Sequence, residues 1–248
     1  MRVLATYNIK GGVGKTSAAV NLAYLAAREG HRTLLWDLDP QGAATFLFRI
    51  RPRVRGGVKA LIRGQASLNA LIKGTDFDNL DLLPADFSYR KMDLALDRAK
   101  RPTRRIAQLL KPLAAEYDIV ILDCPPSVSL VSEGVLRAAD TLLVPLVPTT
   151  LSMRTFDQLI DFVAHAKPPR PRILAFFSMV DGRKRLHRDT IAKVGTERSD
   201  VAGSIVPAAS VVEQMGPRRL PVVVLSPTSV AAAAYERLWA EVRDLAEP

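Results

Sequence analysis

The chain has 248 residues, of which 48% are hydrophobic, and it carries a formal net charge of +10 at pH 7. This length can bury a substantial core without staples, and the single cysteine, Cys124, excludes an internal disulfide or a thiolate metal cluster within one chain. The sequence has no apolar run of transmembrane length and no secretory signal pattern at its N-terminus, so we expect a cytosolic protein whose basic charge attracts nucleic acid or an anionic membrane surface.

Apolar runs rich in β-branched residues alternate with helical patterns along the whole chain. Several runs are apolar at nearly every position, as expected for parallel strands that are covered on both faces. The alternation predicts βαβ units in an α/β fold with a doubly wound, mostly parallel sheet flanked by helices. The predicted strands are Arg2–Tyr7, Thr33–Trp36, Leu80–Leu83, Ile119–Leu122, Thr141–Val147, Ile173–Met179 and Val201–Val206. The predicted helices include Ser17–Glu29, Ser129–Ala138, Thr155–Ala166 and Ser229–Leu245.

Two irregular stretches separate some of these elements. Arg49–Lys59 is rich in Arg, Gly and Pro, which predicts a loop with a short helix after it. The Pro-rich stretch Lys167–Pro171 predicts a connection into the strand that begins near Ile173. Neither stretch reads as a linker between domains, and no internal repeat is present. We therefore expect a single domain over residues 1–248.

The first predicted strand leads into a glycine-rich loop, Lys10–Thr16 (KGGVGKT), and then into a helix. Glycines let the backbone amides turn toward phosphate oxygens, and the helix N-terminus adds the positive end of its dipole. Lys15 supplies a charge for the β- and γ-phosphates, and the Thr16 hydroxyl can coordinate Mg²⁺. Ile9 stands where a standard Walker motif has its first glycine. The predicted ligands are ATP and Mg²⁺, and the predicted nucleotide-binding residues here are Gly11, Gly12, Val13, Gly14, Lys15, Thr16 and Ser17.

Aspartates follow two of the buried strands. Asp37 and Asp39 lie in DLDPQG after the second strand, and Asp123 lies in DCPP after a later one. Ligands gather at the carboxyl ends of strands in open α/β sheets, so these side chains are expected beside the phosphate loop. Each could instead cap the following helix. Together with the loop they favour a magnesium site, held directly or through water by Thr16, Asp37 and Asp123.

KGGVGKT, DLDPQG and DCPP together resemble the ParA/MinD family of deviant Walker P-loop ATPases, closest to its small, Soj-like partitioning members. The likeness continues through Ser178–Arg183 (SMVDGR) and Val206-Pro207, and it covers essentially the whole chain. It implies that Lys10 is the signature lysine, which reaches across a dimer interface to the partner's phosphates. It also implies that Asp39 helps to place the attacking water, that Asp123 is the Walker B carboxylate, and that Met179 and Pro207 lie near the adenine. The expected catalytic residues are Lys10, Lys15 and Asp39.

Other branches of the family are tested by what the sequence lacks. The nitrogenase iron protein needs bridging cysteines, the tyrosine kinases carry a C-terminal tyrosine cluster, and large plasmid proteins carry an N-terminal helix-turn-helix domain. The phosphate loop at residue 10 leaves no room for that domain, so none is expected. MinD ends in a basic membrane helix, whereas residues 236–248 carry mixed charge. We expect Leu238, Val242 and Leu245 to pack in the core instead.

The basic residues form four clusters with few aromatic residues between them. This pattern suits sequence-independent contact with duplex phosphates better than base stacking, although each cluster could also be a solvated helix face. The first two clusters lie within residues 49–63 and 98–105, and resemblance to the family favours the third and fourth as the DNA-facing surface. The predicted DNA-binding residues are Arg183, Lys184, Arg185, Arg188, Arg218 and Arg219.

The leading hypothesis is a cytoplasmic, nucleoid-associated ATPase that forms a homodimer when it binds ATP. The dimer would bind duplex DNA without sequence preference, and a ParB-like or cargo-adaptor protein would stimulate hydrolysis to ADP and phosphate. The output would be the segregation or positioning of a chromosome, a plasmid or a protein complex, with no membrane partner expected. Two alternatives remain: a MinD-like ATPase acting at a membrane surface, and a metabolic P-loop ligase such as dethiobiotin synthetase.

Overall fold

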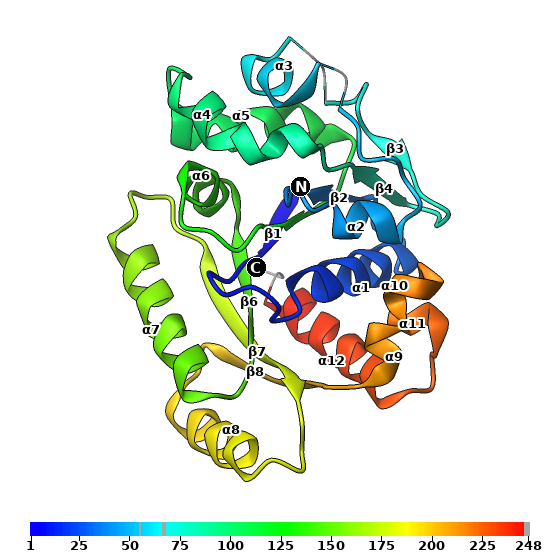
Figure 1. The fold of residues 1–248 in the computed structure, drawn as a ribbon, viewed down its shortest axis with the longest axis vertical. Helices are drawn as coiled ribbons and strands as arrows, with labels where there is room; N and C mark the ends of the chain where they lie inside the picture. Colours follow the sequence, from blue (N-terminus) through cyan, green and yellow to red (C-terminus); the bar gives the residue numbers. More distant parts are fainter. Residues whose placement is uncertain (55, 66–67, 246–248) are drawn as a thin grey trace.

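The computed structural model describes residues 1–54, 56–65 and 68–245, and within them eight strands form one sheet. The strand order is β3-β4-β2-β5-β1-β6-β7-β8, and all neighbours are parallel except β3 and β4 (Figure 1). The strands are β1 (Arg2–Thr6), β2 (Thr33–Asp37), β3 (Lys73–Gly74), β4 (Leu80–Leu83), β5 (Ile119–Asp123), β6 (Thr141–Leu146), β7 (Arg172–Val180) and β8 (Val201–Pro207). All seven predicted strands are confirmed to within one residue at each end.

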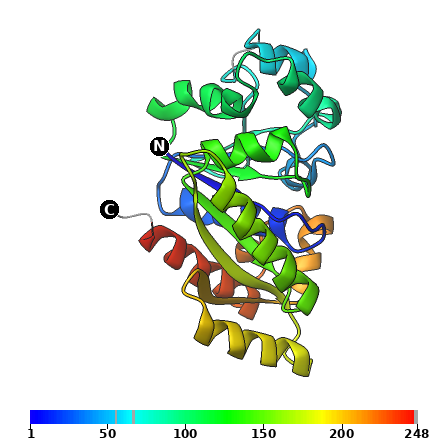
Figure 2. The ribbon, with the colours of Figure 1, turned by 90° about the vertical axis from the view of Figure 1, so that its left-hand side faces the viewer.

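Helices cover both faces of the sheet (Figures 1 and 2). Neighbouring residues of a strand point to opposite faces, so Val3 and Ala5 of β1 enter one core and Leu4 enters the other. One core includes α3 (Gly57–Arg63), α4 (Met92–Asp97), α5 (Arg105–Leu110), α6 (Leu130–Ala138), α7 (Thr150–His165) and α8 (Arg185–Glu197). The other includes α1 (Lys15–Arg28), α2 (Ala43–Leu47), α9 (Ser210–Glu213), α10 (Met215–Arg218), α11 (Val222–Leu225) and α12 (Val230–Asp244). Short 3₁₀ turns, η1 (Phe87–Lys91), η2 (Pro102–Arg104) and η3 (Lys111–Ala115), join some of the helices.

The position of β1 fixes where a ligand can bind. Its neighbours are β5 and β6, whereas the strand that follows it in the chain, β2, lies on the far side of β5. The chain therefore builds the sheet outward from β1 in both directions, and β1 lies at a switch point of the topology. Loops at the carboxyl ends of strands beside such a point leave a crevice between them. The loop between β1 and α1 lies in this position.

The prediction from the sequence missed some elements and misplaced the start of another. Helix α7 begins five residues before its predicted start at Thr155, because the hydroxyl of Thr149 accepts a hydrogen bond from the Ser152 amide (3.4 Å) and caps the helix there. Strand β3 is a two-residue antiparallel edge strand and α8 is strongly charged, so neither has the apolar pattern that was sought. The described part of 49–59 is irregular up to α3, as predicted, and Arg55 lies outside the described residues.

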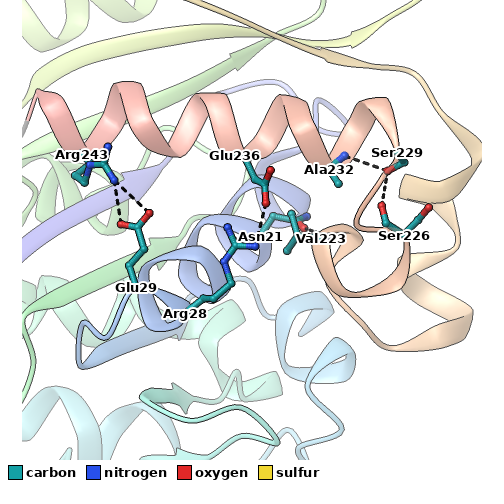
Figure 3. A network of polar contacts seen from close by, with 9 residues as sticks. All are labelled: Asn21, Arg28, Glu29, Val223, Ser226, Ser229, Ala232, Glu236 and Arg243. Atoms are coloured by element: carbon teal, nitrogen blue, oxygen red, sulfur yellow. Dashed lines mark hydrogen bonds and ion pairs between the residues drawn. The ribbon is translucent and has the colours of Figure 1, made fainter.

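Helix α12 packs against α1, as Figure 3 shows. The side chains of Leu238 and Val242 are 0% and 2% exposed, which confirms the expectation that this helix belongs to the core. Ion pairs join Arg28 to Glu236 (2.9 Å) and Arg243 to Glu29 (3.2 Å), while Asn21 of α1 accepts a hydrogen bond from the backbone amide of Val223 (3.3 Å) (Figure 3). Within the described residues, no helix has both the length and the apolar character that a membrane span needs.

Candidate functional site

The loop between β1 and α1 has a backbone that only glycine accommodates well. Gly12 and Gly14 have φ angles of 68° and 93°, in the left-handed region that residues with a Cβ rarely adopt. A Cβ atom on Gly14 would also lie 2.7 Å from the hydroxyl oxygen of Ser178, on β7. Gly14 is therefore required both by its conformation and by the close approach of β7. Helix α1 begins directly after it, with the positive end of its dipole at the loop.

Asn8 and Lys15 hold the loop from inside. The Asn8 side chain donates to the carbonyl of Pro145 (2.8 Å) and accepts from the amide of Lys10 (2.9 Å). The Lys15 ammonium donates to the carbonyls of Asn8 (3.2 Å) and Lys10 (2.9 Å). Burial lowers the pKa of Lys15, and the nearby Asp123 carboxylate opposes that shift. A buried cation bonded only to loop carbonyls is well placed to turn toward an anion in the loop. Apart from its position next to the loop, no sequence pattern pointed to Asn8.

A cavity of about 370 Å³ lies over this loop. It brings together all nine predicted nucleotide-binding residues, the seven loop residues 11–17 with Met179 and Pro207, and Asp39 of the predicted catalytic residues lines it as well. Sequence reasoning missed six further lining residues, which are Pro126, Ser178, Val206, Val212, Glu213 and Tyr235. Three of them, Pro126, Ser178 and Val206, belong to the motifs DCPP, SMVDGR and Val206-Pro207, which is a signal that could have found them. Glu213 lies on the short helix α9, for which the sequence has no comparable signal.

Asp37 and Asp123 lie beneath the cavity rather than in its lining. They are register partners on adjacent strands and are almost completely buried. Asp37 accepts hydrogen bonds from the amide and hydroxyl of Thr45 (2.8 and 2.7 Å) and from the amide of Asp39 (3.2 Å). Asp123 Oδ1 accepts a bond from the hydroxyl of Thr6 (3.3 Å), whereas its buried Oδ2 has no partner among the described residues. Burial, and then the charge of the neighbouring carboxylate, raise the pKa of Asp123, and burial raises that of Asp37.

This unpartnered oxygen makes the site suitable for a magnesium ion. The Thr16 side chain and the Lys15 ammonium lie near enough to Asp123 to lower its pKa, against the larger effect of burial. In the part of the chain that is described, no three His, Cys, Asp or Glu side chains are grouped to hold a metal. Mg²⁺ needs only one or two such ligands when phosphates and water supply the others. Thr16 and Asp123 fit that role. Both oxygens of Asp37 already accept hydrogen bonds. Its contact with the metal therefore stays a prediction, and it could be made through a bridging water.

Replacing Asp123 by asparagine is expected to stabilise the protein in the absence of nucleotide and Mg²⁺. The folded state raises the pKa of Asp123, so wild-type stability falls as the pH rises from the unfolded value, about 3.9, toward the folded one. Asp123→Asn removes this buried charge and should raise the free energy of unfolding at pH 8 by about 1–3 kcal/mol. Urea unfolding in EDTA at pH 5 and pH 8 measures it. Equal destabilisation at both pH values would contradict the assignment.

The predicted DNA-binding residues lie at two separate places on the surface. Arg183, Lys184, Arg185 and Arg188 are exposed on the β7–α8 connection and the first turn of α8. Arg183 pairs with Asp181 (3.0 Å) and holds the pKa of that carboxyl near 2, and Arg185 lies 3.4 Å from Asp189. Arg218 and Arg219 are exposed at the end of α10, in the helix layer on the other face of the sheet.

Arg49, a member of the first basic cluster, lies beside Arg218 and Arg219. The guanidinium of Arg219 lies over the ring of Phe46, 4.1 Å from its centre. Arg49 reaches the carbonyl of Arg218 (3.5 Å) and pairs with Asp76 (2.7 Å). Arg49, Arg218 and Arg219 therefore form one basic patch, although they are far apart in the sequence.

Comparisons with known proteins agree with this geometry. A family model described as an AAA domain matches residues 1–173. The chain is 33% identical to the chromosome partitioning protein ParA of Myxococcus xanthus over 83% of this chain and 75% of that one. It is 30% identical to the sporulation initiation inhibitor protein Soj of Bacillus subtilis over 97% of this chain and 98% of that one. Among solved structures, the cobyrinic acid a,c-diamide synthase of Mycobacterium smegmatis, with a bound ATP analogue and magnesium, superposes with a TM-score of 0.81 and 27% identity, covering 98% of this chain and 94% of that one.

Proposed function

Because the chain belongs to the ParA/MinD family of P-loop ATPases and is similar to Soj, we propose that it hydrolyses ATP to segregate or position a cargo. The observation that carries this proposal is the cavity over the glycine-rich β1–α1 loop, which the buried Lys15 lines and beneath which Asp123 has a carboxylate oxygen without a partner among the described residues. The bound ATP analogue and magnesium of the M. smegmatis structure support ATP and Mg²⁺ as its ligands.

Several residues in and beneath the cavity have tasks that follow from their positions. The loop amides and Lys15 would bind the phosphates, and Thr16 with Asp123 would hold Mg²⁺, which neutralises phosphate charge when it is bound. Asp39 lines the cavity, and its Oδ1 accepts a bond from the Gln41 amide (2.9 Å), which fixes the carboxylate where it can orient a water. Pro207 and the exposed Met179 would border the base at the ends of β8 and β7.

Lys10 is the member of the loop that is suited to act on a second subunit. Its side chain is exposed, whereas that of Lys15 is buried. We infer that two ATP-bound subunits pair through this face, so that Lys10 of each reaches the phosphates held by the other. A cation added from outside stabilises charge on the transferring phosphoryl group in the same way as an arginine finger. The ATP-bound form would then be a homodimer.

The exposed basic residues would let the ATP-bound dimer bind DNA. Four exposed residues near the start of α8 and the patch of Arg49, Arg218 and Arg219 would contact duplex phosphates on the nucleoid. Dimerisation would double this surface, so ATP would favour binding and hydrolysis would favour release. A ParB-like or cargo-adaptor protein would stimulate hydrolysis and couple the cycle to movement, in the cytoplasm.

DNA binding is expected to require ATP and to fall steeply with salt. If several cations neutralise phosphates, log K should fall by about 0.9 per phosphate contact for each unit of log[salt]. Arg218→Glu/Arg219→Glu should weaken binding to every duplex sequence by a similar factor while leaving ATP-dependent dimerisation intact. Fluorescence anisotropy with two unrelated duplexes, in ATP and in ADP, measures this. An absence of binding at low salt would remove DNA as the track.

Two other functions have distinct tests. A metabolic ligase is the second candidate function, because the similar M. smegmatis protein is named a diamide synthase. ATP turnover that depends on a small carboxylic acid and an amine donor would favour it. A MinD-like role would need the protein to sediment with anionic liposomes in ATP. Because α12 is packed into the core, it would have to unfold before it could insert into a bilayer.

A further inference from the structure

Two basic clusters that are far apart in the sequence meet among α3, α4 and α5, the helices at the top of Figure 1. There they line a groove with a volume of about 750 Å³, within the range of natural ligand pockets. Seven of its 12 lining residues are Lys or Arg, and none of the 12 is Asp or Glu. It shares no residue with the cavity over the β1–α1 loop. We call it the basic groove; its cations include Lys59, Arg63, Lys91, Arg98, Arg101 and Arg105.

The walls of the basic groove are helix faces. Lys91, Leu94, Ala95 and Arg98 follow the spacing i, i+3, i+4 and i+7, which places them on one face of the turn and helix that run through α4. Another face of α4 is buried in the core. On α3, Lys59, Ile62 and Arg63 follow i, i+3 and i+4. Packing of the buried faces therefore fixes the cations around the groove.

The cations of the groove have no carboxylate partner in the described part of the chain. None of its seven cations forms an ion pair with a residue in 1–54, 56–65 or 68–245. Asp93 of α4 faces away and accepts a bond from the Val131 amide of α6 (3.0 Å). Arg105 donates to the carbonyl of Ile62 (2.5 Å) and ties α5 to α3. Seven neighbouring like charges attract an anionic ligand strongly.

Apolar side chains also line the groove, which narrows the choice of ligand. Leu94 is 64% exposed, and the small side chains of Ala95 and Ala99 leave space beside it. A duplex is convex, presents phosphates to a protein, and has no side chain to fill an apolar hollow. An amphipathic peptide helix offers both apolar and acidic side chains. Its apolar anchors can cover the apolar residues of the groove, while its carboxylates on either side pair with the surrounding cations.

We propose that the basic groove is the docking site for an acidic amphipathic segment of a partner protein. Carboxylates of the segment pair with the rim from Lys59, Arg98 and Arg101, and an aliphatic anchor covers Leu94. The proposal is independent of ATP binding, because the groove and the nucleotide cavity have different residues. It gives those members of the first two basic clusters that line the groove a task that is separate from DNA binding.

The test uses the full chain and a synthetic probe, a fluorescein-labelled peptide with leucine at every third or fourth position among glutamates. Anisotropy should show saturable binding at low salt. Arg98→Glu/Arg101→Glu should weaken it at least about tenfold, and Leu94→Ser about fivefold, because the first reverses rim charge and the second removes only the anchor contact. Lys73→Glu/Lys193→Glu alters net charge equally at exposed positions outside the groove and should change affinity less than about twofold.

Three results would overturn the proposal. One is the absence of saturable peptide binding by the wild-type protein. Another is an equal loss in the Lys73→Glu/Lys193→Glu control, which would mean that net charge alone attracts the peptide. The third is peptide binding that Leu94→Ser does not weaken, together with displacement of the peptide by duplex DNA. That result would make the groove a phosphate-binding surface. Thermal melting of each variant checks that the fold is retained.

Discussion

Replacing Lys15 by alanine is expected to weaken ATP binding by about 100-fold or more. Its ammonium is buried in the loop and donates to two backbone carbonyls, so it is already positioned where the β- and γ-phosphates would lie. Removing a buried cation from a hydrogen-bonded charge pair leaves the phosphate charge without its partner. Titration of the protein with a fluorescent ATP analogue in the presence of Mg²⁺ measures the change.

The matched control is Lys73→Ala, which removes an exposed lysine from the edge strand β3 and should leave affinity unchanged. The Lys15→Ala protein should keep a thermal melting temperature close to that of the wild type, because its carbonyl partners can bind water instead. Wild-type affinity in a folded Lys15→Ala protein would show that the phosphates bind elsewhere, and the nucleotide assignment would be withdrawn.

Replacing Lys10 by alanine is expected to lower the ATPase rate by about 10³-fold while leaving ATP binding by the monomer nearly unchanged. The reason is that, in the proposed dimer, the exposed Lys10 would act on the partner's nucleotide. Asp39→Ala should also lose turnover, because no carboxylate would orient the water, but it should accumulate as an ATP-bound dimer on a sizing column. Steady-state phosphate release measures both rates.

Mixing the two inactive variants separates action in trans from action in cis. In a mixed dimer, the Lys10→Ala subunit keeps its own Asp39 and receives Lys10 from its partner, which restores one complete site. Random pairing should then return about a quarter of wild-type activity. If Lys10 acted on its own subunit's nucleotide, neither site of the mixed dimer would be complete and the mixture would stay inactive. Lys10→Ala mixed with Lys10→Ala/Asp39→Ala is the matched control and should remain inactive under both models.

The sequence predicted the sheet well because its strands are parallel and buried. A strand such as β5, with every residue buried, has to be apolar throughout, and that pattern is visible without a structure. Elements that depend on distant contacts were harder to predict. The start of α7 depends on a side-chain cap, and the conformation of α3 to α5 depends on a core that they share with residues from the whole chain.

In the candidate site, too, local features could be predicted from the sequence and features that depend on distant contacts could not. The loop residues that are expected to contact phosphates were predictable, since glycine, lysine and threonine at these spacings have a direct chemical purpose. The bonds that Asp37 makes to Thr45 were not, because they depend on where α2 lies beneath β2. Thr45 also accepts a bond from the Ala85 amide (2.8 Å) after β4, so one hydroxyl links three segments. No local pattern predicts such a residue. The meeting of two basic clusters in the basic groove was equally hidden, since residues 59 and 101 are adjacent only in the fold.

The pairing of α1 with α12 has a consequence for the order in which the chain is made. Their contact between Arg28 and Glu236 spans 208 positions, so α1 leaves the ribosome long before its partner exists (Figure 3). Until then, the apolar side of α1 that belongs to this shared core has no complete cover. A nascent chain therefore carries its phosphate loop on a helix that is not yet fixed, and a translation product that stops before Val230 would expose this surface to chaperones and proteases. The first motif to be synthesised therefore sits on a helix whose core is completed only when one of the last helices has been added.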